Sequence, residues 1–102
     1  MNDNKILFEA IALRKCVKAS YNRGNIKIAP HILYTRHGEL FLDAVTLERE
    51  GQPPREVKIG TFKLTGLQIH GLVDDHQFEV NEAFDPANDK YEGVTLFAVE
   101  AA

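Results

Sequence analysis

The sequence predicts a mainly β domain (α+β when the elements are counted), built as a small, strongly bent antiparallel sheet with one leading helix. Helical spacing of apolar residues is clear near the N-terminus, whereas period-two alternation begins at Cys16 and recurs along the chain. Glycine-containing turns separate the alternating stretches. A chain of 102 residues is predicted to form one domain, residues 1–102.

Residues 4–15 are predicted to form the leading helix. Ile6, Ala10 and Leu13 recur at helical spacing. Arg14 and Lys15 fall in the last turn, where cations interact favourably with the helix dipole. We therefore expect one apolar stripe of this helix to pack on the sheet.

A first strand over residues 16–22 follows from strict alternation of apolar and polar residues. The next four residues, NRGN, indicate a turn in which Gly24 tolerates a positive φ. The second strand starts at Ile26 and contains Pro30. Because proline has no N–H donor, Pro30 is expected at an edge position or a bend.

A hairpin over residues 26–44 is the element around which the rest is organised. Its turn is predicted at Arg36, His37 and Gly38. The return strand, about 39–49, is apolar on both faces near its start, so both faces should be covered there.

After the loop EGQPPR, alternation resumes at Val57 and changes phase at Gly60 and Thr61. A phase change beside a glycine is typical of a β-bulge, which would bend this strand. The sheet is predicted to extend over residues 16–72. The remaining residues, 73–102, form an acidic C-terminal segment.

The acidic segment is predicted to contain a short helical turn and a last strand. Asp85 followed by Pro86 is a helix-start signal, and Gly93 would end the turn. The run VTLFAV then predicts the strand. The acidic side chains lack the order of a calcium-binding loop, so a solvated face is expected.

Composition limits the classes of function. A formal charge of −3 argues against bulk binding of nucleic acid, although a local basic patch remains compatible with it. A lone cysteine favours a reducing compartment. The chain shows neither a signal peptide nor an apolar run of membrane-spanning length, so a soluble cytoplasmic protein without membrane association is expected.

Catalytic, cofactor and metal motifs are not evident, and the chain is predicted not to be an enzyme and to carry no cofactor. Cys16 could pair with a histidine as a nucleophile, but its position between helix and strand favours the core. The histidines have no metal-ligand spacing. His37 is expected in a turn, and His70 and His76 at the surface. His31 is kept as a candidate because it follows Pro30.

Asp43 lies within an apolar strand and allows two interpretations. It either faces solvent, or is buried and paired with a cation such as Arg36 or Lys63. Exposure on the outer face of the strand is the prediction.

Five motifs in this order resemble the WYL domain family over residues 6–67: AIALRK, VKASYN, IAPHILY, RHGELFLDA and TFKLTGL. The family's Trp-Tyr-Leu run corresponds to Leu40, Phe41 and Leu42. Its Phe-Arg-Leu strand corresponds to Phe62, Lys63 and Leu64. The chain is therefore similar to a divergent, stand-alone WYL-like domain.

The resemblance implies a Sm-like or SH3-like β-barrel and a ligand-sensing role in bacterial transcription regulation or phage defence. It implies binding of an anionic, nucleotide-like or nucleic-acid ligand. Carried over position by position, the implied pocket comprises Tyr21, His31, Phe41 and Lys63, with Ser20 and Arg36 as further candidates. Gly60 and Gly66 stand where the family has arginines, so the best bidentate phosphate ligands are missing.

A second function class is also open. The domain could instead bind a regulatory protein partner, or form a homodimer, through an exposed strand edge or the acidic segment. The missing arginines favour this alternative.

Overall fold

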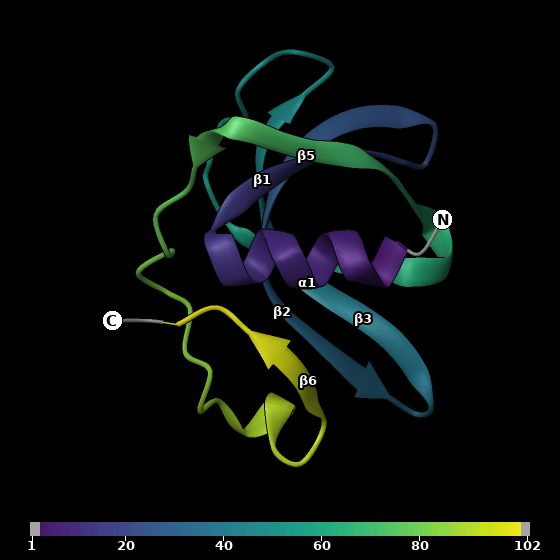
Figure 1. The fold of residues 1–102 in the computed structure, drawn as a ribbon, viewed down its shortest axis with the longest axis vertical. Coiled ribbons are helices and arrows are strands. Elements are labelled where there is room, and N and C mark those ends of the chain that lie inside the picture. The colour runs from purple at the N-terminus through teal and green to yellow at the C-terminus, as the bar shows by residue number, and fades with distance from the viewer. Residues whose placement is uncertain (1–2, 101–102) are drawn as a thin grey trace.

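The computed structural model describes residues 3–100, with backbone alone at residues 3 and 74–76. In this part of the chain, one α-helix precedes six strands that form an antiparallel sheet (Figure 1). The elements are α1 (Asp3–Leu13), β1 (Lys15–Tyr21), β2 (Gly24–Arg36), β3 (Glu39–Arg49), β4 (Ile59–Lys63), β5 (Leu67–Gln77) and β6 (Thr95–Ala98). Two single 3₁₀ turns are η1 (Leu64–Gly66) and η2 (Asp89–Tyr91). The prediction of a mainly β fold with a leading helix is confirmed.

The long strand β2 lies at the centre of the sheet. The strand order is β4-β3-β2-β1-β5, and β6 also pairs with β2. Pairing with β1 ends at Ile28, and pairing with β6 begins at Ile32. Pro30 lies between these two points, and the β2–β3 register shifts immediately after it. The residue without an N–H donor therefore sits where β2 changes partners, which agrees with the predicted bend.

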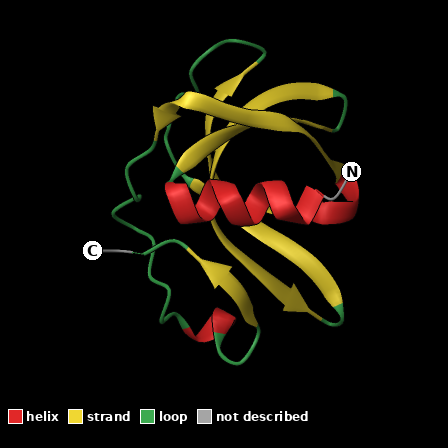
Figure 2. Cartoon of the chain, viewed as in Figure 1, coloured by secondary structure: helices red, strands yellow, loops and turns green. Residues whose placement is uncertain are grey.

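The sheet curls strongly but is not closed into a barrel. Within the described residues, β4 and β5 are joined through η1 and share no pairing. The curl still brings β1 and β4 together, because Tyr21 and Phe62 meet edge to face with ring centroids 5.0 Å apart. Figure 2 shows α1 crossing the strands on one side of this curl.

Helix α1 packs on β1, β2, β5 and β6 through Leu7, Ala10 and Ile11, all of which are buried. This stripe differs slightly from the predicted one, because Leu13 is half exposed at the end of the helix. Cys16 is buried in the core, as predicted. Among the described residues, no helix is long and apolar enough to cross a membrane.

Several local predictions are wrong. In the β1–β2 turn, the positive φ values belong to Asn22 and Arg23 rather than to Gly24. The β3–β4 register is continuous, so no bulge lies at Gly60 and Thr61. Register shifts occur instead in β2, at Pro30, and between β1 and β5. The β2–β3 and β1–β5 ladders thus contain irregularities that bend the sheet, whereas the β1–β2 ladder between them is continuous.

The boundary at residue 73 is also wrong, because β5 continues to Gln77. No helix begins at Asp85, whose carboxylate instead accepts a hydrogen bond from the N–H of Ala87 in a turn. The helical turn of this region is η2, where the side chain of Asn88 accepts a hydrogen bond from the N–H of Lys90. The side chains of Asp74, Asp75 and His76 lie outside the described part of the structure.

Residues 78–94, called here the C-terminal segment, run from the end of β5 to the start of β6. Three aromatic side chains of this segment are buried: Phe78, Phe84 and Tyr91. They pack against the same core as the strands. The C-terminal segment therefore acts as a second cover for the sheet, beside α1.

Replacement of Leu7 by alanine tests the helix cover. The Leu7 side chain is fully buried, so Leu7→Ala should lower the free energy of unfolding by about 2–5 kcal/mol. Urea unfolding followed by circular dichroism measures this loss. Lys5→Ala, at an exposed position of the same helix, is the matched control and should change stability by less than about 0.5 kcal/mol.

Candidate functional site

The polar centre of the structure is a buried carboxylate. Asp43 of β3 is 1% exposed, so the prediction that it faces solvent is wrong. Among described residues, four side chains donate hydrogen bonds to it. Tyr34 and Thr61 each donate to Oδ1 at 2.8 Å, whereas Lys90 donates to Oδ2 at 2.8 Å and Tyr91 at 2.5 Å.

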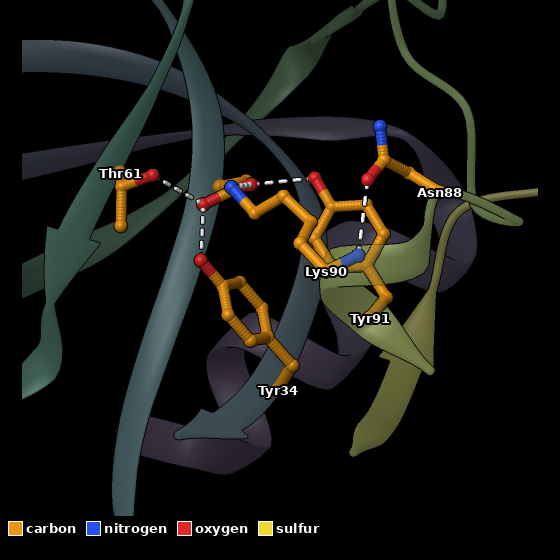
Figure 3. Close-up of polar contacts among 6 residues, drawn as sticks. Tyr34, Thr61, Asn88, Lys90 and Tyr91 are labelled. Carbon is orange, nitrogen blue, oxygen red and sulfur yellow. Dashed lines mark hydrogen bonds and ion pairs between the residues drawn. The ribbon is translucent and has the colours of Figure 1, made fainter. Parts of the chain in front are cut away.

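These five side chains are called here the Asp43 cradle. Figure 3 shows the hydroxyl groups of Tyr34, Thr61 and Tyr91 converging from three directions. The pairing cation was predicted to be Arg36 or Lys63 if Asp43 were buried. It is instead Lys90, which comes from the C-terminal segment, 47 positions along the chain.

Protonation in the cradle follows from these contacts. Burial by itself would raise the pKa of Asp43, but the hydrogen bonds from Lys90 and the three hydroxyls outweigh it and lower that pKa. Burial, followed by the hydrogen bond to Asp43, raises the pKa values of Tyr34 and Tyr91. At Lys90, burial would lower the pKa, but the Asp43 carboxylate raises it overall. At neutral pH the cradle therefore holds a carboxylate, an ammonium and neutral phenols.

His31 is a second buried polar group on β2. Its Nδ1 lies 2.8 Å from the carbonyl oxygen of Ala29, and its Nε2 accepts a hydrogen bond of 3.0 Å from the N–H of Asn81. The ring stacks on Phe78 and meets Phe84 edge to face. Burial lowers the pKa of His31 below its ordinary value, although the Ala29 carbonyl and the Asp43 charge act against this. His31 is thus a neutral ring with both nitrogens used inside the chain.

An open hollow of about 380 Å³ lies over β1, β2 and β5. We call it the basic hollow. Its cationic and imidazole side chains are Lys18, Lys27 and His70, and Glu48 is the carboxylate that lines it among the described residues. Lys18 and Lys27 stand directly opposite each other in the β1–β2 ladder.

A like-charge pair in directly opposed positions destabilises a sheet. Glu48 offsets it in part, because its carboxylate lies 3.6 Å from the ammonium of Lys27. Next to Lys18 on β1, the hydroxyl of Ser20 lies 2.6 Å from Nε2 of His70 and 3.2 Å from the side-chain oxygen of Asn25. The basic hollow therefore combines surplus positive charge with several hydrogen-bonding groups.

The residues implied by the WYL resemblance fall into separate places. Phe41 and Lys63 are opposite each other across β3 and β4. The Lys63 ammonium forms an ion pair of 3.1 Å with Glu39, and Arg36 is the β2 partner of Glu39. These three candidates therefore lie toward the turn end of the β2–β3 hairpin, where the Lys63 ammonium is paired with the Glu39 carboxylate.

The other three candidates lie elsewhere. Tyr21 packs on Phe62 inside the curl, and the neighbouring Ser20 points to the opposite face, toward His70. His31 is enclosed by the C-terminal segment. The six residues thus do not line one concavity, and of them only Ser20 lies beside the basic hollow.

Comparisons with family models, with curated proteins and with solved structures give no match to this chain. No group of three or more metal-ligating side chains occurs among the described residues.

Replacing Asp43 by asparagine tests the cradle. The amide cannot accept four hydrogen bonds and leaves the phenols and Lys90 with a poorer partner. We expect Asp43→Asn to lower the free energy of unfolding by about 3 kcal/mol in urea titrations. Asp85→Asn, an exposed carboxylate in a turn, is the control and should be close to wild type. Equal stability of the two variants would contradict the importance of the cradle.

His31 should make stability depend on pH. Its folded-state pKa lies below 6.5, so below about pH 6.5 the unfolded chain takes up a proton that the folded chain does not. The free energy of unfolding should therefore fall as the pH drops from 7.5 to 5, by at most about 1.4 kcal/mol per unit. Once the pH is below the pKa of His31 in the folded state, the titration of His31 no longer lowers the free energy of unfolding. Urea titrations of the wild type and His31→Gln should show a shallower slope for the variant; identical slopes would exclude this contribution.

Proposed function

We propose that this chain is a non-enzymatic, cytoplasmic ligand-binding domain of a regulatory system, related to WYL domains, and that it binds a small anionic, nucleotide-like molecule in the basic hollow. The observation that carries the proposal is the direct opposition of Lys18 and Lys27 at this hollow. A bound anion would remove the repulsion that the free protein retains there.

The groups around the hollow suit a phosphate or carboxylate. Two ammonium groups can donate hydrogen bonds to anionic oxygens, and Ser20, Asn25 and His70 add further polar groups. A volume of about 380 Å³ lies within the range of small-molecule sites. Because the whole chain carries a net charge of −3, a local anion site fits better than a long nucleic-acid track.

Two further observations support this function class. The curled sheet with its crossing helix is compatible with an open variant of the Sm-like or SH3-like barrel that the WYL resemblance implies. Cys16, the nucleophile that an enzymatic role would use, is buried, and burial raises the pKa of its thiol. A binding role is therefore favoured over covalent catalysis.

The alternative is a module for homo-oligomerisation or protein binding. Strand β6 pairs with β2 on one side, and no strand of the described chain pairs with its other side. Leu96 on β6 and Phe8 on α1 are 50% and 38% exposed. An edge of this kind can pair with a second chain.

Neutralising the hollow tests the proposal. Isothermal titration with inorganic phosphate and adenosine monophosphate should show binding to the wild type. In the double variant Lys18→Gln/Lys27→Gln, loss of two charge-assisted contacts should weaken the affinity at least about 10-fold. Lys58→Gln is the matched control, because Lys58 is an exposed lysine paired with Glu56 away from the basic hollow.

Lys63→Gln is measured in parallel, because the WYL resemblance points to that position. Weakening by Lys63→Gln alone would move the site to the end of the β2–β3 hairpin. Equal affinities in all variants, or no response to either anion, would contradict the proposal. Sedimentation of the same samples separates the alternative, which predicts a concentration-dependent dimer that does not respond to anions.

A further inference from the structure

The two oxygens of Asp43 have partners from different parts of the chain. Oδ1 accepts hydrogen bonds from Tyr34 on β2 and Thr61 on β4, both within the sheet. Oδ2 accepts hydrogen bonds from Lys90 and Tyr91, both in η2 of the C-terminal segment. The sheet therefore holds the carboxylate in place and leaves one oxygen for donors that come from outside the sheet.

The surroundings of the Lys90 ammonium are those of an ammonium-binding site. Its Nζ lies 2.8 Å from Oδ2 of Asp43, 5.6 Å from the ring centroid of Tyr34 and 5.2 Å from that of Tyr91. A carboxylate and two phenol rings together attract a cation through charge, a hydrogen bond and cation–π contact.

The ammonium occupies the outer end of the cradle. The side chain of Lys90 is 42% exposed, whereas that of Asp43 is 1% exposed. An open hollow of about 370 Å³ lies beside both residues, and Asn81, Asp85 and Asn88 also line it. Rotation of the flexible lysine stem into this hollow can vacate one donor position on Oδ2, while the hydroxyl of the buried Tyr91 keeps its hydrogen bond to the same oxygen.

We propose that the Asp43 cradle is an ammonium-binding site, that Lys90 fills it as a built-in occupant, and that a small primary alkylamine binds Oδ2 when the Lys90 ammonium is withdrawn. One oxygen of each of Asn81, Asp85 and Asn88 accepts a backbone hydrogen bond, so such a ligand would meet the remaining polar atoms of these side chains in the hollow. Lys58, also at the rim, is paired with Glu56. This site is separate from the basic hollow and does not depend on it.

Chemical rescue of Lys90→Ala tests the proposal. Propylammonium supplies the three carbons and the ammonium that the alanine lacks. Thermal unfolding of the variant should shift upward with propylammonium chloride, relative to sodium chloride at the same ionic strength. The shift should reach about 2 °C when the ligand concentration equals its Kd, and above that it should keep rising with the logarithm of the ligand concentration. Tyrosine fluorescence is a second readout, because the chain has three tyrosines and no tryptophan and two of them line the cradle.

Three controls define the outcome. Wild type should show a smaller shift at the same propylammonium concentration, because the ligand must first displace the Lys90 ammonium from the cradle. The double variant Asp43→Asn/Lys90→Ala should not respond, and tetramethylammonium, which has no N–H, should not rescue Lys90→Ala. If Lys90→Ala does not fold, Lys90→Met retains the stem, and ammonium chloride then supplies the missing group. The proposal would be overturned if propylammonium did not shift the thermal unfolding of Lys90→Ala. It would also be overturned if the shift were the same in Lys90→Ala and in Asp43→Asn/Lys90→Ala.

Discussion

The hydrogen bonding of one buried carboxylate links most parts of this molecule. Asp43 stands on β3, its sheet partners stand on β2 and β4, and its remaining partners come from the C-terminal segment. A buried charge without partners is strongly destabilising. The covered sheet face can therefore exist only when the C-terminal segment is docked, although that segment contains little regular secondary structure.

His31 is a second buried polar group that requires the C-terminal segment to be docked on the sheet. One ring nitrogen is satisfied within β2 and the other by the backbone of the C-terminal segment, which also contributes the aromatic rings around it. The two polar contacts and the buried rings stabilise one another, because each excludes water from the next. His31, which the WYL resemblance implied as a pocket residue, is thus used for internal packing. The surplus positive charge lies elsewhere, in the basic hollow over β1, β2 and β5.

Local signals explain what the sequence could predict. The β2–β3 turn at His37 and Gly38, the strand Glu39–Arg49 and the bend at Pro30 depend on neighbouring residues, and each was found where expected. The position of Asp43 depends on Lys90 and Tyr91, more than 40 residues away, and no local pattern carries that information. The pairing of Lys18 with Lys27 could have been predicted from the sequence, because a two-residue turn at Asn22 and Arg23 places these two lysines opposite each other.

The two hairpin turns also differ in their backbone conformation, and this affects how much each turn depends on the surrounding sheet. Both have positive φ at both central residues, but the β2–β3 turn places a glycine at one of them, whereas the β1–β2 turn uses Asn22 and Arg23. A left-handed arginine is costly to form in an isolated chain. The β1–β2 turn is therefore the more strained of the two, and the pairing of β1 with both β2 and β5 holds it in that conformation.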